Sequence, residues 1–273
     1  MILDGKTLAQ EIIATVKQAV KPGAVPGLAV VQVGDDPASG IYVAKKEKAC
    51  KDVGFFSRRV ALPESISEAD LIAEIKRLNA DPRIHGILLQ LPVPQHIDAL
   101  KAQSAISPSK DVDGLHPENI GFLCMGSPRF IPCTPKGIIR LLDHHGIAIE
   151  GKHVVIIGRS NLVGKPLAQL FLLRNATLTI CHSKTADLAA ITQQADILVS
   201  AVGKPGLVTP AMVKPGAVVI DVGITRIDGK VIGDVDPAVM KKASAMTPVP
   251  GGVGPMTIAM LLENTLEAMR RCR

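Results

Sequence analysis

The stretch KHVVIIGRSNLVGKP, residues 152–166, decides the fold. Its apolar first half is typical of a buried strand, and residues 165–174 continue as a helix. Gly158 at the strand end permits a tight turn, and Gly164 lets the helix pack close to the sheet with its first amides directed at an anion. The spacing is G-x5-G rather than G-x-G-x-x-G, and an ordinary β–α turn can carry the same glycines. The loop therefore indicates a dinucleotide site that needs further support.

Strands and helices alternate on both sides of this loop. Downstream, we expect strands at 177–182, 196–202 and 217–222 and helices at 187–194 and 255–271. Upstream, we expect helices at 6–20, 37–54 and 67–79, the last capped by Ser67, and strands at 27–34, 55–62 and 85–92. The downstream βαβαβ series predicts a Rossmann-like domain, and the upstream alternation predicts another α/β domain with a mostly parallel sheet. The predicted fold class is α/β with two domains.

A loosely patterned segment, residues 110–135, separates the two series, and the domain boundary is placed at its end. Thr134 is the predicted N-cap and Pro135 the first position of a helix that runs to Gly146. The predicted domains are 1–134 and 135–254.

Composition limits the class of protein. Of 273 residues, 47% are hydrophobic but only 2% aromatic, so the cores must be built from aliphatic residues and base-stacking nucleic-acid surfaces are disfavoured. The net charge of +6 favours small anionic partners, because the basic residues are dispersed. The five cysteines form no CxxC pair, and the N-terminus lacks signal-peptide features. We expect reduced thiols in a cytoplasmic protein that binds neither nucleic acid nor membrane.

The end of the strand at 177–182 bears on cofactor choice. An NAD site places an acidic residue about 20 positions after the first glycine, to bind the ribose hydroxyl. Here the strand ends in CHSK and has no carboxylate. Arg159, Ser160 and Ser183 could instead surround a 2′-phosphate, which favours NADP.

A second candidate site lies in the first domain. Ser39, Tyr42 and Lys46 fall on one face of the helix at 37–54, and Tyr42 is the only tyrosine of the chain. A solvated helix face can carry the same residues, but this helix follows a strand, where α/β sheets place their sites. Gln90 is a polar residue at the end of an apolar strand. The loop KDVDG at 110–114 carries two carboxylates but no further ligands at fixed spacing, so no metal is expected.

These segments together resemble the bifunctional methylenetetrahydrofolate dehydrogenase/methenyltetrahydrofolate cyclohydrolase family. The resemblance runs nearly from end to end. It rests on SGIYVAKKEKACKDVG (39–54), GILLQLPVP (86–94), KDVDGLHPENIG (110–121), PCTPKGI (132–138), VVIIGRSNLVGKP (154–166), TICHSKT (179–185) and TPVPGGVGPMT (247–257). No motif position departs from the family pattern.

The resemblance implies a role for each candidate residue. Lys46 would be the main catalytic group, Tyr42 would lie against the folate, Gln90 would bond and tune Lys46, and Asp113 would hold the pterin ring. Other residues implied to line the folate are Leu89, Leu91, Pro250, Gly251, Gly252, Val253 and Gly254. Those implied to hold NADP are Gly158, Arg159, Ser160, Gly164, Ser183 and Ile224.

The resemblance also implies the reactions. The family oxidises 5,10-methylenetetrahydrofolate to the methenyl form with NADP and then hydrolyses it to 10-formyltetrahydrofolate, a multifunctional oxidoreductase and hydrolase of one-carbon metabolism and purine biosynthesis. It implies a homodimer, a cleft between the domains and a last helix, 255–273, that returns to the first domain. A family member with dehydrogenase activity alone is one alternative, and a non-catalytic nucleotide-binding regulator is another. A short-chain dehydrogenase would place its glycine loop before its Tyr and Lys, the reverse of the order here.

The chemistry explains why these groups are needed. Water attacks a cationic carbon in the hydrolysis, which requires a positioned base or water-orienting group. The usual lysine pKa is about 10.4, so burial, the neighbouring Lys45 and the substrate cation are all expected to favour neutral Lys46. Adjacent N–H donors on the pterin edge suit the two acceptor oxygens of Asp113.

Overall fold

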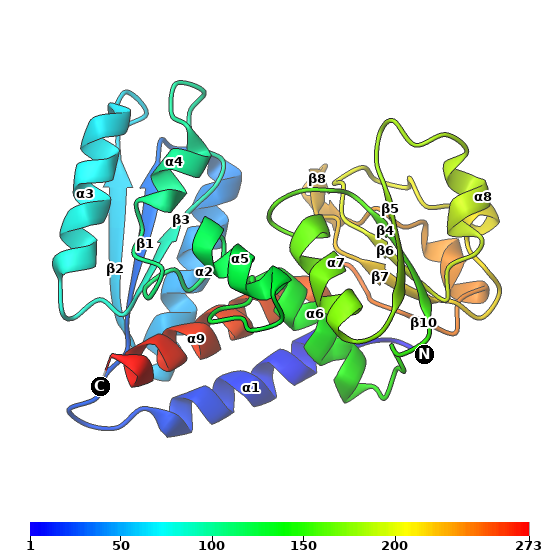
Figure 1. The fold of residues 1–273 in the computed structure, drawn as a ribbon, viewed down its shortest axis with the longest axis horizontal. Coiled ribbons are helices and arrows are strands. Elements are labelled where there is room, and N and C mark those ends of the chain that lie inside the picture. The colour runs from blue at the N-terminus through cyan, green and yellow to red at the C-terminus, as the bar shows by residue number, and fades with distance from the viewer. Residues whose placement is uncertain (273) are drawn as a thin grey trace. The chain divides into compact units, whose positions relative to one another are not determined.

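The computed structural model describes residues 1–272 and contains two compact units (Figure 1). The N-terminal unit comprises Gln10–Cys133 and the chain from Ile258 onward, and the Rossmann unit comprises Met1–Ala9 and Thr134–Thr257. The first nine residues thus group with the Rossmann unit, whereas the sequence placed them in the first domain. Backbone pairing explains this, because the Leu3 amide donates to the Met246 carbonyl at 2.9 Å.

The N-terminal unit is built around a three-stranded parallel sheet in the order β2-β1-β3. Its elements are α1 (Gly5–Ala19, shared with the other unit), β1 (Gly27–Val33), α2 (Pro37–Val53), β2 (Phe56–Leu62), α3 (Glu68–Ala80), β3 (Gly86–Leu89), α4 (Ala99–Ser104) and α5 (Pro117–Cys124). Strand β1 is buried along its whole length. Helices α3 and α4 cover one sheet face through Leu71, Ile75, Leu78 and Ala102.

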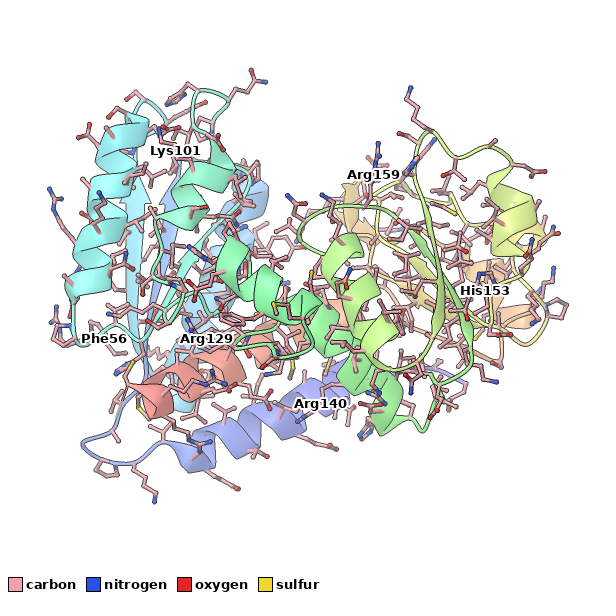
Figure 2. The ribbon with its side chains drawn as sticks, in the orientation of Figure 1. Phe56, Lys101, Arg129, Arg140, His153 and Arg159 are labelled. Atoms are coloured by element: carbon pink, nitrogen blue, oxygen red, sulfur yellow. The ribbon has the colours of Figure 1, made fainter. Side chains whose placement is uncertain are left out.

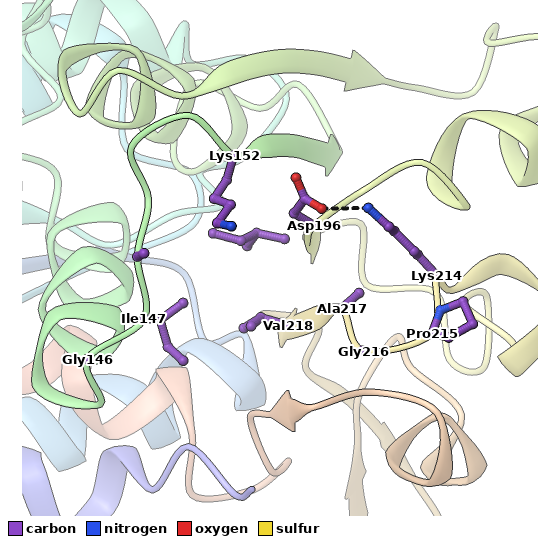
Figure 3. Close-up of a pocket in the computed structure, with 11 residues that line it drawn as sticks. Gly146, Ile147, Lys152, Asp196, Lys214, Pro215, Gly216, Ala217 and Val218 are labelled. Atoms are coloured by element: carbon purple, nitrogen blue, oxygen red, sulfur yellow. Dashed lines mark hydrogen bonds and ion pairs between the residues drawn. The ribbon is translucent and has the colours of Figure 1, made fainter.

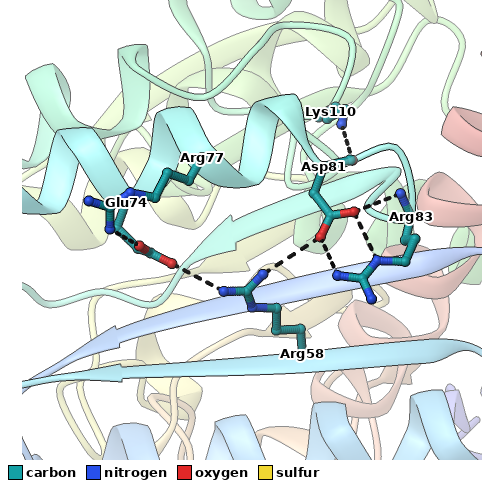
Figure 4. A network of polar contacts seen from close by, with 6 residues as sticks. All are labelled: Arg58, Glu74, Arg77, Asp81, Arg83 and Lys110. Atoms are coloured by element: carbon teal, nitrogen blue, oxygen red, sulfur yellow. Dashed lines mark hydrogen bonds and ion pairs between the residues drawn. The ribbon is translucent and has the colours of Figure 1, made fainter.

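A polar network fastens the edge strand β2 to α3 and the turn that follows it (Figure 4). Arg58 of β2 forms ion pairs with Glu74 at 3.4 Å and with Asp81 at 3.6 Å. Arg83 pairs with Asp81 at 2.8 Å, and the Lys110 amine donates to the Asp81 carbonyl at 2.9 Å. Asp81 therefore links three segments of the unit.

The Rossmann unit carries a five-stranded parallel sheet in the order β10-β7-β6-β4-β5. Its elements are α6 (Cys133–His144), β4 (His153–Ile157), α7 (Gly164–Leu173), β5 (Thr177–Cys181), α8 (Leu188–Thr192), β6 (Ile197–Ser200), the 3-10 helix η1 (Pro210–Met212), β7 (Val218–Asp221), the hairpin β8 (Thr225–Ile227) and β9 (Lys230–Ile232), the 3-10 helix η2 (Pro237–Lys241), β10 (Ala245–Met246) and the start of α9 (Val253–Arg271). Strands β4, β6 and β7 are almost wholly buried, as in a sheet covered on both faces.

The predicted strands and long helices are present, with ends shifted by a few residues. Thr134 is not an N-cap, because α6 already begins at Cys133, and α9 begins at Val253 rather than Pro255. Helices α4 and α5 and the β8–β9 hairpin were not predicted, since segments this short carry little periodicity. Within residues 1–272, no helix combines the length and the apolar character needed to cross a membrane.

Candidate active site

Helix α2 begins immediately beyond the carboxyl end of β1. Asp36 caps it by accepting a hydrogen bond from the Ser39 amide at 2.7 Å, and Pro37 fits the first helical position, where no amide partner is needed. Ser39 is buried, while Tyr42 and Lys46 are half-buried on the same face. These three side chains therefore do not lie on a fully solvated helix face.

Lys46 meets Gln90 at the end of the neighbouring strand. The Lys46 Nζ donates to Gln90 Oε1 at 2.9 Å, and Gln90 Nε2 donates to the Leu91 carbonyl at 2.7 Å. The backbone of Gln90 is fixed to β1, since its backbone N–H donates to the Val31 carbonyl at 2.8 Å. Both functional groups of the Gln90 side chain are thus engaged, and its carbonyl is held facing the lysine.

Asp113 lies in a loop that is anchored beside β3. The Ile87 amide donates to the Lys110 carbonyl at 2.8 Å, which adds the start of the loop to the sheet edge. The thiol of Cys133 hydrogen-bonds the Asp113 carboxylate and also lies 3.4 Å from the Val112 carbonyl. Asp113 and Lys46 interact electrostatically, so the structure brings together Lys46, Gln90 and Asp113, the three groups singled out in different motifs.

Burial shifts the protonation of both charged groups toward their neutral forms. It lowers the pKa of Lys46, and the negative charge of Asp113 opposes this shift. It raises the pKa of Asp113, against the opposing effects of Lys46 and of the Cys133 hydrogen bond. The expected contribution of Lys45 is absent, because Lys45 is exposed and its ammonium lies 6.0 Å from the centre of the Tyr42 ring.

Three supporting residues were not assigned a role from the sequence. Buried Asp111 accepts hydrogen bonds from the His116 amide at 2.8 Å and from Asn119 Nδ2 at 2.8 Å. Asn264 Nδ2 of α9 donates to the Val112 carbonyl at 2.9 Å and to the Ile131 carbonyl at 3.1 Å. These bonds fix the loop segments on either side of Asp113 in the sequence, and Cys133 contacts the Asp113 carboxylate itself. Two signals were available: the second carboxylate of the KDVDG loop, Asp111, and a polar Asn among the apolar positions of the last helix.

The phosphate loop of the Rossmann unit leaves no room for side chains at its two glycines. Gly158 has a φ of +122°, and a Cβ there would lie 2.6 Å from the Ala201 carbonyl oxygen. A Cβ on Gly164 would lie 2.1 Å from the Gly158 oxygen. Helix α7 begins at Gly164 without a side-chain cap. The Lys165 and Leu167 amides donate to the Ser160 and Val163 carbonyls and Pro166 has no amide hydrogen, so the Gly164 amide is the one at the helix start that suits an anion. The loop fits a dinucleotide pyrophosphate.

The residues predicted for the 2′-phosphate share the carboxyl edge of the sheet. Arg159 is exposed in the loop that follows β4 (Figure 2). Ser160 in the same loop and Ser183 after β5 are also exposed. The register pairs Ile157 with Cys181, so both strands end at the same level. Ile224, 41% exposed, lies beyond β7 at this edge. Its Cδ1 lies 3.7 Å from the position that a Cβ of Gly254 would occupy.

A pocket lies at the opposite edge of the same sheet (Figure 3). Lys152, Asp196 and Ala217, which line it, each come directly before a strand, and Lys214 pairs with Asp196 at 2.6 Å. Dinucleotides bind at the carboxyl ends of parallel strands, which excludes this pocket as the cofactor site.

Comparisons with known proteins decide the family. Residues 3–113 match the catalytic domain of tetrahydrofolate dehydrogenase/cyclohydrolase, and residues 132–273 match its NAD(P)-binding domain. The chain belongs to this family. The bifunctional protein FolD of Geotalea uraniireducens is 56% identical over 276 residues, 99% of each chain.

Solved structures agree with this assignment. The bifunctional FolD enzyme of Campylobacter jejuni superposes with a TM-score of 0.97 at 48% identity, over 100% of this chain and 99% of that one. The Trypanosoma brucei enzyme, solved with NADP cofactor and an inhibitor, superposes with a TM-score of 0.96 at 40% identity, over 100% and 98%. The predicted family, the fold class of two α/β domains and the pair of activities, dehydrogenase and cyclohydrolase, are confirmed.

Proposed function

We propose that the Lys46–Gln90–Asp113 cluster catalyses the one-carbon chemistry of this tetrahydrofolate dehydrogenase/cyclohydrolase and that NADP is its cofactor. The observation that carries the proposal is the hydrogen bond of 2.9 Å from a half-buried lysine amine to a fixed glutamine carbonyl. Few structural roles require a lysine to lose solvent next to a neutral partner, because burying an ammonium is costly.

The hydrogen bond gives Lys46 a defined orientation. A neutral amine has two N–H donors and one lone pair, and donation to Gln90 directs the lone pair away from Oε1. The lowered pKa increases the neutral fraction. In the hydrolysis, Lys46 would take one proton from the water that attacks the methenyl carbon. The resulting C–OH would become the formyl C=O as the C–N bond of the ring breaks, and its proton would pass to the leaving ring nitrogen.

Asp113 and Tyr42 position the substrate in this proposal. The paired N–H donors of the pterin would favour the ionised carboxylate of Asp113 and offset the effect of its burial. Tyr42 lies one helical turn before Lys46 on the same face and would contact the folate ring. Leu89, Leu91 and residues 250–254 remain assigned to the folate by the family resemblance.

The Rossmann unit would hold the cofactor by its pyrophosphate and 2′-phosphate. The close turn at Gly158 and the Gly164 amide at the start of α7 suit the pyrophosphate, and Arg159, Ser160 and Ser183 suit the 2′-phosphate. Ile224 would contact the cofactor at the same edge. When bound, NADP supplies the hydride acceptor for oxidation of the methylene carbon.

We also propose a cytoplasmic homodimer that serves one-carbon metabolism, including purine biosynthesis, as in the family. The purified chain, mixed with 5,10-methylenetetrahydrofolate and NADP, should produce the methenyl absorbance band and then consume it. With methenyltetrahydrofolate as substrate and no NADP, the band should decay faster than in buffer alone. If the first band forms but no decay is accelerated, the proposed role of the cluster in hydrolysis is wrong, and if neither occurs the whole proposal is wrong.

A further inference from the structure

Two aspartates are buried at the carboxyl edge of the Rossmann sheet. Asp221 ends β7 and is 3% exposed, and Asp234 follows the β8–β9 hairpin and is fully buried. Neither belongs to the sequence motifs of the candidate active site. Burying two carboxylates close together is costly unless each is well supplied with donors.

The donors to the Asp234 carboxylate come from the last residue of β6 and from the loop that follows it. Its Oδ2 accepts hydrogen bonds from Ser200 Oγ at 2.9 Å and from the Val202 amide at 2.9 Å. Its Oδ1 accepts from the Lys204 amide at 2.7 Å. One side chain thus satisfies the backbone of the loop at alternate positions and fixes its course.

Asp221 likewise accepts hydrogen bonds from backbone amides, in the segment after β7 and in the segment after β9. Its Oδ1 accepts from the Gly223 amide at 3.0 Å and the Asp234 amide at 2.9 Å, and its Oδ2 accepts from the Val235 amide at 2.9 Å. The two aspartates are therefore linked, since the first holds the backbone that carries the second.

The glycines around the pair show how closely it packs. A Cβ on Gly223 would lie 2.1 Å from Asp234 Oδ1, and a Cβ on Gly233 would lie 1.9 Å from Asp221 Oδ2. Each carboxylate thus fills the space that a side chain would need on the opposite loop. A change in the position of either carboxylate would therefore displace the loop that faces it.

The loops held by this pair adjoin the phosphate loop. The Ala201 carbonyl and the Val202 side chain are the nearest atoms to the Cβ position of Gly158, at 2.6 and 3.4 Å. Thr225 Oγ1 donates to the Gly203 carbonyl at 3.1 Å and joins the β6 loop to the segment just after Ile224. Val202 and Ile224 remain 42% and 41% exposed, so both loops present apolar side chains at the cofactor edge.

We infer that Asp234, supported by Asp221, is a positioning residue for the cofactor, and that it preorganises the loops at 201–204 and 222–224 for NADP. This inference rests on the proposed use of NADP. It predicts a specific effect on cofactor binding, because Asp234 accepts from Ser200 and the loop at 201–204, Asp221 accepts from Gly223, and neither bonds Lys46, Gln90 or Asp113.

The Asp234→Asn variant tests the inference, since it keeps the shape but turns an acceptor into a donor that faces donors. We expect the Kd for NADP to rise about ten-fold or more, as for a lost hydrogen bond to a charged group. Hydrolysis of methenyltetrahydrofolate, measured without NADP, should stay within about two-fold. Amide hydrogen exchange at 201–204 should accelerate, while that of β4 should not.

The matched control is Asp236→Asn, in the same segment, whose carboxylate caps η2 through the Ala238 amide at 2.8 Å. It should leave NADP affinity unchanged. Ser200→Ala, which removes a single donor, should weaken NADP binding in the same direction by a smaller factor and provides the test if Asp234→Asn does not fold. Unchanged NADP affinity in both Asp234→Asn and Ser200→Ala, or equal losses of NADP binding and hydrolysis, would overturn the inference. If the wild-type chain fails to bind NADP, the proposed cofactor itself is wrong.

Discussion

The Lys46 amine donates to the Gln90 side-chain carbonyl at 2.9 Å, and Gln90 in turn donates to the Leu91 carbonyl at 2.7 Å. This chain of bonds ties a helix that follows β1 to the end of β3. Because the partner of the lysine is neutral, the amine is oriented without being locked into its charged form. An ion pair at this position would orient it equally well but would raise its pKa.

Replacement of Lys46 tests the central role in the site. Lys46→Met keeps the apolar stem but removes the amine, so cyclohydrolase activity should be abolished and dehydrogenase activity at least severely reduced, while NADP still binds. Lys48→Met is the control, since Lys48 is on the same helix but 75% exposed. Normal hydrolysis of methenyltetrahydrofolate by Lys46→Met would remove this residue from the mechanism.

Gln90→Glu should alter the pH dependence of hydrolysis. A carboxylate in place of the amide favours the ammonium form and raises the pKa of Lys46. If the neutral amine acts as the base, the rate climbs as pH rises through the Lys46 pKa. The variant should therefore be slower at neutral pH and should recover at higher pH. A rate–pH profile that overlaps that of the wild type would show that Lys46 does not titrate in this step.

Asp113→Asn should weaken folate binding specifically. The amide places a donor opposite the donors of the pterin, and the loss of a charge-assisted bond with an unpaired group left behind costs roughly 2–4 kcal/mol. Titration calorimetry should show this loss for the folate, with NADP affinity changed by no more than a few-fold. Asp35→Asn, an exposed carboxylate in the turn after β1, should be neutral. If Asp113→Asn binds folate as tightly as Asp35→Asn does, the Asp113 carboxylate does not contact the pterin.

The sequence predicted those parts of the site that depend on local pattern. Ser39, Tyr42 and Lys46 share a face because helical spacing requires it, and Gly158 and Gly164 carry their own signal in the loop after a strand.

The supports of the site depend on long-range packing. Asn264 reaches the Val112 carbonyl across 152 positions of sequence, and Asp234 reaches Ser200 across 34. No spacing rule connects such pairs, because their contacts exist only after the sheet and the last helix are assembled. For the pKa of Lys46, the expected effect of burial is confirmed, whereas Lys45 is not among the causes of the shift.

Acid should weaken the network of ion pairs that joins Arg58, Asp81 and Arg83 in the N-terminal unit. Hydrogen bonds from Arg83 lower the pKa of Asp81 to about 2 from an ordinary 3.8. The stabilisation is therefore complete above the unfolded-state pKa and is lost as pH falls through the folded-state value. Asp81→Asn should lower the urea midpoint at pH 7, and the difference from wild type should shrink between pH 4 and pH 2. Asp52→Asn, which breaks only an exposed pair with Lys48, should leave the midpoint nearly unchanged. A constant difference at every pH would show that Asp81 acts through packing alone.

The choice between NADP and NAD depends on two features at the carboxyl ends of the Rossmann strands. Arg159 directly follows Gly158, and no acidic residue ends β5, where an NAD enzyme would bind the ribose hydroxyl. A 2′-phosphate can accept from the planar guanidinium and from Ser160 and Ser183. Charge-assisted bonds of this kind contribute about 1.5–3 kcal/mol, roughly ten- to a hundred-fold in affinity.

The wild-type enzyme should therefore prefer NADP over NAD by about ten-fold or more in kcat/KM. Arg159→Ala should strongly lower the use of NADP and leave the use of NAD almost unchanged, because NAD lacks the phosphate that Arg159 would bind. Lys152→Ala is the matched control, a basic residue of the same unit at the amino edge of the sheet. Steady-state kinetics with both cofactors distinguish the remaining possibilities. Equal losses for NADP and NAD would assign Arg159 to the shared pyrophosphate, and no loss for either would mean that Arg159 does not contact the cofactor.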